Sequence, residues 1–302
     1  TVPYELRIRA LIEAGQFALA LSMLEELPPE KKEMGEARFL KALALSRQGD
    51  HSGALKEEAK IKTPLPPGDR WTLDLLKAQA LWLSGKLDGG REILQSMLKK
   101  EAVPRDRFRL LCQLSMHYLN SNNAFLAREF LNEARDLTLR FEPGQFEKFL
   151  LSHHSGTLER VADRLENALA LFREASAHAG QGGYFFLEAW SDVEAGNILR
   201  LLGRSGEALP LLLKAASGAR ALRFSNLEET ARFDAIVAEI EAGGLLRAEE
   251  EIRGLREART VKASPLETAV ENYWLSRILL LRGRLVEASG EADRGLMILG
   301  SS

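Results

Sequence analysis

Hydrophobic positions along this chain recur with the 3.6-residue period of amphipathic α-helices, in pairs separated by short polar breaks. The pattern is clearest in the middle of the chain, where Trp190, Val193 and Leu201 share one helical face. The polar stretch 203–206 then interrupts the pattern, and the helical period resumes over 209–216. No region shows the sustained alternation of a β-strand. The sequence therefore predicts an all-α fold built from helical hairpins.

A turn residue followed five positions later by a small residue occurs eight times. The expected turns are Gly15, Gly49, Gly85, Asn122, Asp163, Gly203, Gly243 and Gly283. The small residues are Ala20, Ala54, Gly90, Ala127, Ala168, Ala208, Ala248 and Ala288. Successive turns lie 34, 36, 37, 41, 40, 40 and 40 residues apart. A period of this size is typical of a solenoid, in which each repeat buries its apolar face against its neighbours.

The small residue has a steric explanation. Near a tight turn, the two helices of an antiparallel pair approach closely, so a large side chain would force them apart. The facing position, seven residues before the turn, is small in six of eight repeats: Ile8, Ala42, Ala78, Ser115, Gly156, Gly196, Ile236 and Ser276. The position nine residues after the turn is apolar in seven of eight: Leu24, Glu58, Leu94, Leu131, Phe172, Leu212, Ile252 and Ala292. We expect this second position to form the core stripe of the second helix.

Composition narrows the classes of partner. The 302 residues carry 41 basic and 43 acidic side chains, a net charge of −2, so no strong field attracts nucleic acid or an anionic membrane. The single cysteine, Cys112, excludes an intrachain disulfide and favours a reducing, cytoplasmic compartment. There is no run of 18 apolar residues that would span a membrane. The chain begins at Thr1 without an initiator methionine or a signal peptide, so we expect it to be part of a longer protein.

Three segments carry a family resemblance. Gly15–Leu21, Gly49–Leu55 and Ala195–Leu199 resemble the tetratricopeptide repeat (TPR), with its small residue in the first helix, its Gly-Asp-Tyr-like turn and its alanine in the second helix. The chain departs from the family because no tyrosine follows any of the eight turns and because only one spacing equals 34. Repeats near 40 residues are similar to those of superhelical sensor domains in a bacterial transcription activator and in signal-transduction ATPases.

The resemblance implies a right-handed α-α superhelix, or solenoid, of about eight TPR-like hairpins. It would extend over 1–302 as a single domain, with repeats of 34–37 residues in 1–141 and of about 40 residues in 142–302.

Candidate catalytic chemistry is sparse. His153 and His154 are adjacent, but neighbours on a helix diverge by about 100°, which disfavours a shared metal and favours ordinary surface or packed histidines. Gly180–Gly183 lacks the preceding strand of a phosphate-binding loop and is interpreted as a flexible connection. The stretch 86–109 has a basic excess of three, which leaves nucleic-acid binding as a weaker alternative. We find no convergent acid, base and nucleophile, and so expect neither an enzyme nor a cofactor or metal.

The candidate binding residues follow from the family arrangement, in which the first helices line a concave groove. The inward positions are ten, six and three residues before each turn. The residues expected to bind a partner at these positions are Gln79, Trp82, Met116, His153, Thr157, Arg160, Asn197, Arg200, Tyr273 and Arg277, together with Asn120, two residues before its turn. Arg160 and Arg200 occupy equivalent positions in adjacent repeats and would suit a carboxylate or a phosphate; alternatively, both are surface arginines. Cys112, Trp82 and Tyr273 are also interpreted as core residues.

These observations favour an interaction module that binds a protein or peptide in its groove, within a larger regulatory protein. The alternative is a small-molecule sensor domain of a bacterial transcription activator or signal-transduction ATPase. No direct contact with nucleic acid or membrane is expected. The last hairpin carries Leu296 and Leu299 without a following polar cap. This predicts an exposed apolar face that is covered in the parent protein by further chain or, in isolation, by a second molecule through self-association.

Overall fold

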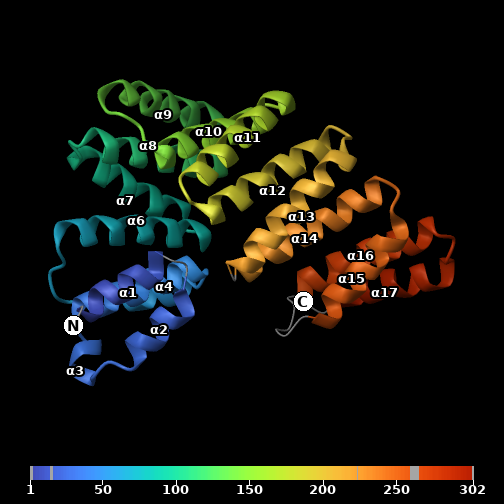
Figure 1. The fold of residues 1–302 in the computed structure, drawn as a ribbon, viewed down its shortest axis with the longest axis horizontal. Coiled ribbons are helices and arrows are strands. Elements are labelled where there is room, and N and C mark those ends of the chain that lie inside the picture. The colour runs from blue at the N-terminus through green and yellow to red at the C-terminus, as the bar shows by residue number, and fades with distance from the viewer. Residues whose placement is uncertain (1–2, 14–15, 223, 259–264, 301–302) are drawn as a thin grey trace. The chain divides into compact units, whose positions relative to one another are not determined.

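The chain folds as helices that pack in sequential pairs. A computed structural model describes residues 3–13, 16–222, 224–258 and 265–300, and within these ranges all regular structure is helical, with no strand. The residues group into two compact units, 1–154 and 155–302, each of which is described by itself (Figure 1). The predicted all-α class and paired helices are confirmed. No described helix is both long and apolar enough to cross a bilayer.

Unit 1 contains four helical hairpins and the start of a fifth. Its elements are α1 (Tyr4–Glu13), α2 (Phe17–Glu25), α3 (Pro29–Lys32), α4 (Gly35–Gln48), α5 (His51–Glu58), α6 (Pro67–Leu83), α7 (Leu87–Lys100), α8 (Pro104–Asn120), α9 (Ala124–Leu137), the short 3₁₀ helix η1 (Thr138–Arg140) and the first part of α10 (Gln145–Val161). The hairpins pair α1 with α2, α4 with α5, α6 with α7 and α8 with α9. The four-residue helix α3 is an addition that the repeat pattern did not predict.

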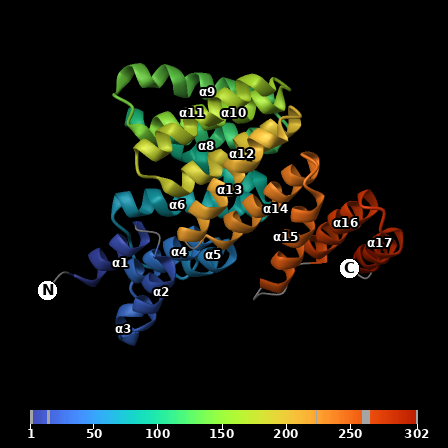
Figure 2. The same cartoon turned by 45° about the vertical axis from the view of Figure 1, so that its right-hand side comes forward.

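Unit 2 begins within α10 and has the more regular repeats. It continues through α11 (Leu165–Gln181), α12 (Phe185–Leu201), α13 (Ser205–Ala221), α14 (Ser225–Glu241), α15 (Leu245–Ala258), α16 (Pro265–Leu281) and α17 (Leu285–Gly300). Each helix from α11 onward packs against the next along the chain, and α12 also contacts α14 (Figures 1 and 2). From α11 to α14, two helices of 17 residues and two three-residue connections make up each 40-residue repeat.

The hairpin turns have one shared geometry, a Schellman motif. Seven of the predicted turn residues have positive φ: Gly49, Gly85, Asn122, Asp163, Gly203, Gly243 and Gly283. At Gly203, its own N–H donates to the Arg200 carbonyl at 2.9 Å and the Arg204 N–H donates to the Leu199 carbonyl at 2.8 Å, which satisfies carbonyls at the helix end. The positive φ explains why only glycine, asparagine and aspartate occur here. The eighth predicted turn, Gly15, lies outside the described residues.

The predicted small positions are buried in all eight hairpins. Each is the fourth residue of the second helix, and the facing position on the first helix meets it closely: the Ser276 hydroxyl donates to the Ala288 carbonyl at 2.8 Å. The contact is tightest at Gly90, where an added Cβ would lie 2.7 Å from the Ala78 carbonyl oxygen and 2.7 Å from Cε1 of His117. Glycine is therefore required at this position by the close approach of neighbouring backbone.

Glycines on the first helix make room for the core stripe of the second. A Cβ at Gly196 would lie 2.6 Å from the Leu212 side chain, and one at Gly156 would lie 3.1 Å from the Phe172 ring. Both large side chains are fully buried, as predicted for the position nine residues after the turn. In unit 2 they belong to one continuous core that includes residues from α11 to α14.

One local expectation needs correction, and one proline has an unusual position. The segment at Gly180–Gly183 is an ordered turn and not a flexible loop, because Gly183 has φ 73° and the Tyr184 N–H donates to the Ala179 carbonyl at 2.8 Å. Prolines begin several helices, as at Pro104 and Pro265, but Pro210 lies inside α13. Proline there cannot donate the usual bond to the carbonyl four residues earlier.

Candidate binding surface

The predicted groove residues of unit 1 differ in exposure. Gln79 and Asn120 are exposed, and the Asn120 amide donates to the Met116 carbonyl at 2.8 Å, at the end of its own helix. Met116 is half-buried. Trp82 is also half-buried, and its ring lies 5.6 Å from that of His117 in a tilted arrangement. These residues offer a mostly neutral surface, with the exposed amide side chains of Gln79 and Asn120 at its margin.

Two predicted binding residues are buried. His153 packs against the Phe149 ring, with 5.3 Å between centroids, and Thr157 is covered as well. The repeat register alone does not reveal their burial. His154 is also buried. Both side chains in this pair of histidines, and Cys112 itself, are therefore parts of the interior.

In unit 2, the predicted residues Arg160, Asn197 and Arg200 belong to a row of polar side chains, here called the polar ladder: Arg160, Glu194, Asn197, Arg200, Asp234 and Glu241. The ladder links α10 to α12 and α12 to α14. Nε of Arg160 on α10 lies 4.0 Å from the Glu194 carboxylate on α12. The Asn197 amide on α12 donates to Asp234 on α14 at 2.9 Å.

Arg200 is the most heavily bonded member of the polar ladder. Its guanidinium donates twice to Glu241, both at 3.1 Å, and once to the Asn197 amide oxygen at 3.0 Å. It also lies 3.4 Å from Asp234. The Ser205 hydroxyl completes the group by donating to Glu241 at 2.8 Å. Arg200 is thus neutralised by two acids, whereas Arg160 has a single partner at the limit of an ion pair.

Burial and pairing shift the pKa values of the ladder carboxyl groups in opposite directions. Burial raises the pKa of Glu194 and of Asp234, because the charged form loses solvation that Arg160 and Arg200 only partly replace. Burial also acts on Glu241, but hydrogen bonds from Arg200 and Ser205 outweigh it and lower the pKa of that group. The ladder therefore contains two carboxylates whose charge is incompletely compensated.

Sequence reasoning identified the basic and amide members of the polar ladder but missed its acids. Glu194 and Asp234 lie nine residues before their turns, at equivalent positions one repeat apart. That 40-residue correspondence is the signal that could have found them. Their position faces the preceding first helix, which is why they pair with Arg160 and Asn197.

Tyr273 and Arg277 lie apart from the ladder on α16. Tyr273 is exposed, so its interpretation as core is wrong, and its ring meets the Trp274 ring edge-on at 5.2 Å. The Arg277 guanidinium lies 5.1 Å from the centre of the same indole ring. Such a stacked arginine keeps its donors available to a partner.

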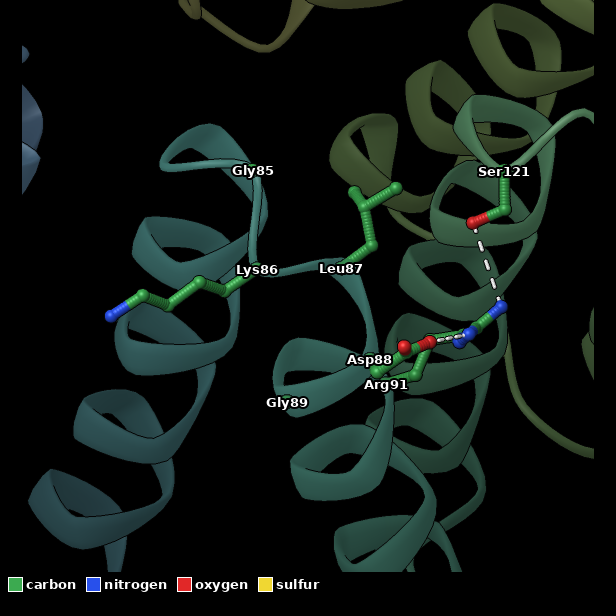
Figure 3. Close-up of a pocket in the computed structure, with 7 residues that line it drawn as sticks. All are labelled: Gly85, Lys86, Leu87, Asp88, Gly89, Arg91 and Ser121. Carbon is green, nitrogen blue, oxygen red and sulfur yellow. Dashed lines mark hydrogen bonds and ion pairs between the residues drawn. The ribbon is translucent and has the colours of Figure 1, made fainter.

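A shallow depression in unit 1 is a weaker candidate. It lies at the third hairpin turn and is lined by Gly85, Lys86, Leu87, Asp88, Gly89, Arg91 and Ser121 (Figure 3). Arg91 is engaged by Asp88, lies 3.5 Å from the Ser121 hydroxyl and stacks over Tyr118. Lys86 points away from this group (Figure 3). In the described part of the chain, no set of three or more His, Cys, Asp or Glu side chains is arranged to hold a metal ion.

The fold is shared with known tetratricopeptide-repeat proteins. A Rap protein in complex with Competence and Sporulation Factor superposes with a TM-score of 0.63 at 14% identity, covering 99% of this chain and 85% of that one. The quorum sensor NprR from B. thuringiensis gives 0.62 at 14% identity, covering 98% and 86%. A signal transduction ATPase (STAND) protein with a tetratricopeptide repeat sensor, from Pyrococcus horikoshii, gives 0.64 at 18% identity.

That alignment covers 97% of this chain and 47% of the ATPase, so the chain spans about half of it. The sequence itself matches no family model and no curated protein. At these identities the likeness establishes the TPR fold, in agreement with the predicted resemblance.

Proposed function

We propose that this chain is a non-catalytic interaction module of a regulatory protein, and that the polar ladder of unit 2 binds a peptide segment of its partner. The observation that carries the proposal is the partly exposed network joining α10, α12 and α14. The side chains of Arg160 and Glu241 keep 43% and 35% of their surface exposed. A single buried cysteine favours a reducing, cytoplasmic setting for this module.

The chemistry of the polar ladder suits a peptide better than a simple anion. A peptide backbone offers both N–H and C=O groups, and the ladder offers both acceptors, on Glu194 and Asp234, and donors, on Asn197 and Arg160. A lone anion would have to displace Glu241 from Arg200, at the cost of a bidentate ion pair. A Rap protein of similar fold has been solved in complex with Competence and Sporulation Factor, which supports a ligand for this fold.

The test is a selection of 12-residue peptides displayed on phage against the full chain, followed by affinity measurements on the enriched peptides. We expect the double variant Arg160→Ala, Asn197→Ala to bind them at least tenfold more weakly. The matched control is Arg173→Ala, which removes an exposed arginine of α11 outside the ladder and should leave binding unchanged. Peptides that bind both variants equally would place the site elsewhere.

The alternative is a small-molecule sensor, which the likeness to the tetratricopeptide repeat sensor of the STAND protein favours. It predicts a different result from the same variants. The peptide selection would yield no binder, while a pool of cytoplasmic metabolites would raise the melting temperature of the wild-type chain and not that of the Arg160→Ala, Asn197→Ala variant.

A further inference from the structure

The two arginines of the polar ladder occupy equivalent positions but have different surroundings. Arg160 and Arg200 each lie three residues before a turn, in consecutive repeats of unit 2. The side chain of Arg200 is only 18% exposed, and it pairs with two acids on α14. The side chain of Arg160 is 43% exposed, and its Nε lies 4.0 Å from Glu194 on α12. Glu194 is the counterpart of Asp234, so only one of the two acids around Arg200 has an equivalent around Arg160.

An exposed leucine occupies the position of the second acid. Glu241 lies two residues before its turn on α14, and the residue two before the turn on α12 is Leu201. Ser205, whose hydroxyl donates to Glu241 at 2.8 Å, corresponds to Leu165, which packs partly buried against the core of unit 2. The surroundings that hold a second carboxylate next to Arg200 are therefore apolar in the preceding repeat.

The pairing of Arg200 with Glu241 shows which group fits beside such an arginine. Nε and Nη2 of Arg200 donate to the two carboxylate oxygens of Glu241, both at 3.1 Å. This is the bidentate arrangement in which two parallel N–H groups match the two oxygens of a carboxylate. At Arg160, the 4.0 Å separation from Glu194 exceeds the roughly 2.7–3.2 Å of a formed N–H···O hydrogen bond. That edge of the Arg160 guanidinium can therefore accept a carboxylate from a ligand.

Leu201 favours such a contact as well. Its side chain is 65% exposed, and it shares a face of α12 with Glu194 and Asn197, at i, i+3 and i+7 spacing. An ion pair beside apolar side chains is screened less by water than one on an open polar surface. The leucine would also contact the carbon atoms that carry the incoming carboxylate.

We propose that Arg160 anchors the peptide that the polar ladder binds, by taking a carboxylate of the peptide in the arrangement that Glu241 has on Arg200. An apolar group of the peptide lies on Leu201. This inference rests on the proposed function and specifies its ligand, which carries an acidic side chain or a free C-terminus next to an apolar group. A phosphate would bring about twice the negative charge close to Glu194, so the singly charged carboxylate fits better.

The first probe is sodium acetate, which tests the anchor without any peptide. In a ¹⁵N-labelled chain at constant ionic strength, acetate should shift the Nε–Hε resonance of Arg160 with saturation. Its half-saturating concentration should be at least about threefold lower than for Arg173. Arg173 is the matched control, because it is 53% exposed and also has one acid, Glu207, at 4.0 Å. Acetamide, which has no charge, should shift neither resonance.

Substitutions at Leu201 test the comparison between repeats. Leu201→Glu supplies the acid that α14 has at this position, so it should pair with Arg160 and weaken the acetate response at least about tenfold. Leu201→Gln has a similar size and no charge, and it should keep the response. Because Leu201 is exposed, both variants should melt like the wild type.

Peptides from the phage selection separate this inference from the proposed function. Each peptide is remade with its acidic residues changed singly to amides and, in another copy, with an amidated C-terminus. One of these changes should weaken binding to the wild type at least about tenfold and to Arg160→Gln less than about twofold, which identifies the source of the carboxylate. Acetate saturation at Arg160 without any enriched peptide would contradict the proposed function and leave the carboxylate site standing. Equal acetate responses at Arg160 and Arg173, an undiminished response in Leu201→Glu, or peptides that lose every carboxylate without losing affinity would overturn the inference.

Discussion

In each unit, ion pairs connect the first helix of one hairpin to the first helix of the next hairpin. The pairs differ between the two units. In unit 1, Arg109 of α8 donates to the Glu147 carboxylate of α10 at 2.7 Å, and Glu147 is only 4% exposed. The second carboxylate oxygen of Glu147 accepts the Gly144 N–H at 3.0 Å, so both carboxylate oxygens accept hydrogen bonds within the fold. In unit 2, the polar ladder performs the same joining role with partly exposed groups. The first pair is buried within the fold, whereas the ladder is partly exposed, as the proposal that it exchanges partners requires.

The largest loss of stability is expected when the buried Arg109–Glu147 pair is broken. Arg109→Ala leaves the Glu147 charge buried with the Arg105 guanidinium 3.9 Å away as its remaining cation, and we expect it to lower the free energy of unfolding by about 3 kcal/mol. Urea unfolding monitored by circular dichroism measures this. A loss below about 1 kcal/mol would show that Glu147 is better solvated than its burial indicates. Glu147→Gln in the Arg109→Ala background should recover part of the loss.

Acid should destabilise unit 1 through its buried histidines. Burial lowers the pKa of both His117 and His154 to about 4, with nearby Arg91 also lowering that of His117. The unfolded chain takes up these protons below about pH 6.5 and the folded chain does not, so stability present at pH 7.5 is lost as the pH falls toward 4. Between pH 7.5 and 5.0, we expect a loss of about 2 kcal/mol for each histidine.

Unfolding curves of the double variant His117→Gln, His154→Gln at the two pH values should show a smaller difference than those of the wild type. The control is His178→Gln in unit 2, a partly exposed side chain paired with Glu174. If this control changes the pH dependence as much as the double variant, the buried histidines are not its source.

The two ladder arginines, Arg160 and Arg200, should differ in how much each contributes to the free energy of unfolding. Arg200→Ala removes the cation from both Asp234 and Glu241, and we expect a loss of about 1–2 kcal/mol at neutral pH. Arg160→Ala should cost less than about 0.5 kcal/mol, because its exposed pairing with Glu194 is weak. Thermal and urea unfolding of the two variants side by side gives the comparison. Equal losses would mean that the ladder is a uniform structural network.

The repeat architecture was predictable because its causes are local. A helix end with positive φ requires glycine, asparagine or aspartate, and Asp163 and Gly203 satisfied this rule in the expected places. The small residues at Gly90 and Ala208 followed from close helix approach within one hairpin. Each of these signals lies within a few residues of the turn that it marks.

The candidate site was only partly predictable because its partners are distant in sequence. The acids that neutralise Arg200 follow it in the sequence by 34 and 41 residues. A list of inward-facing positions therefore contains the arginine without the two acids that neutralise it. The same limit applies to His153 and Thr157, whose burial depends on which helices cover α10. Conversely, Tyr273 is exposed because no described helix covers α16 on that side.

The central claim is that the polar ladder exchanges partners with a ligand while the Arg109–Glu147 pair does not. Arginine Nε–Hε resonances from a ¹⁵N-labelled chain report both sites in one experiment. On addition of a peptide from the phage selection, we predict that the resonances of Arg160 and Arg200 shift with saturation while that of Arg109 stays in place. Shifts confined to Arg109, or no shift at Arg160 and Arg200 at saturating peptide, would contradict the account.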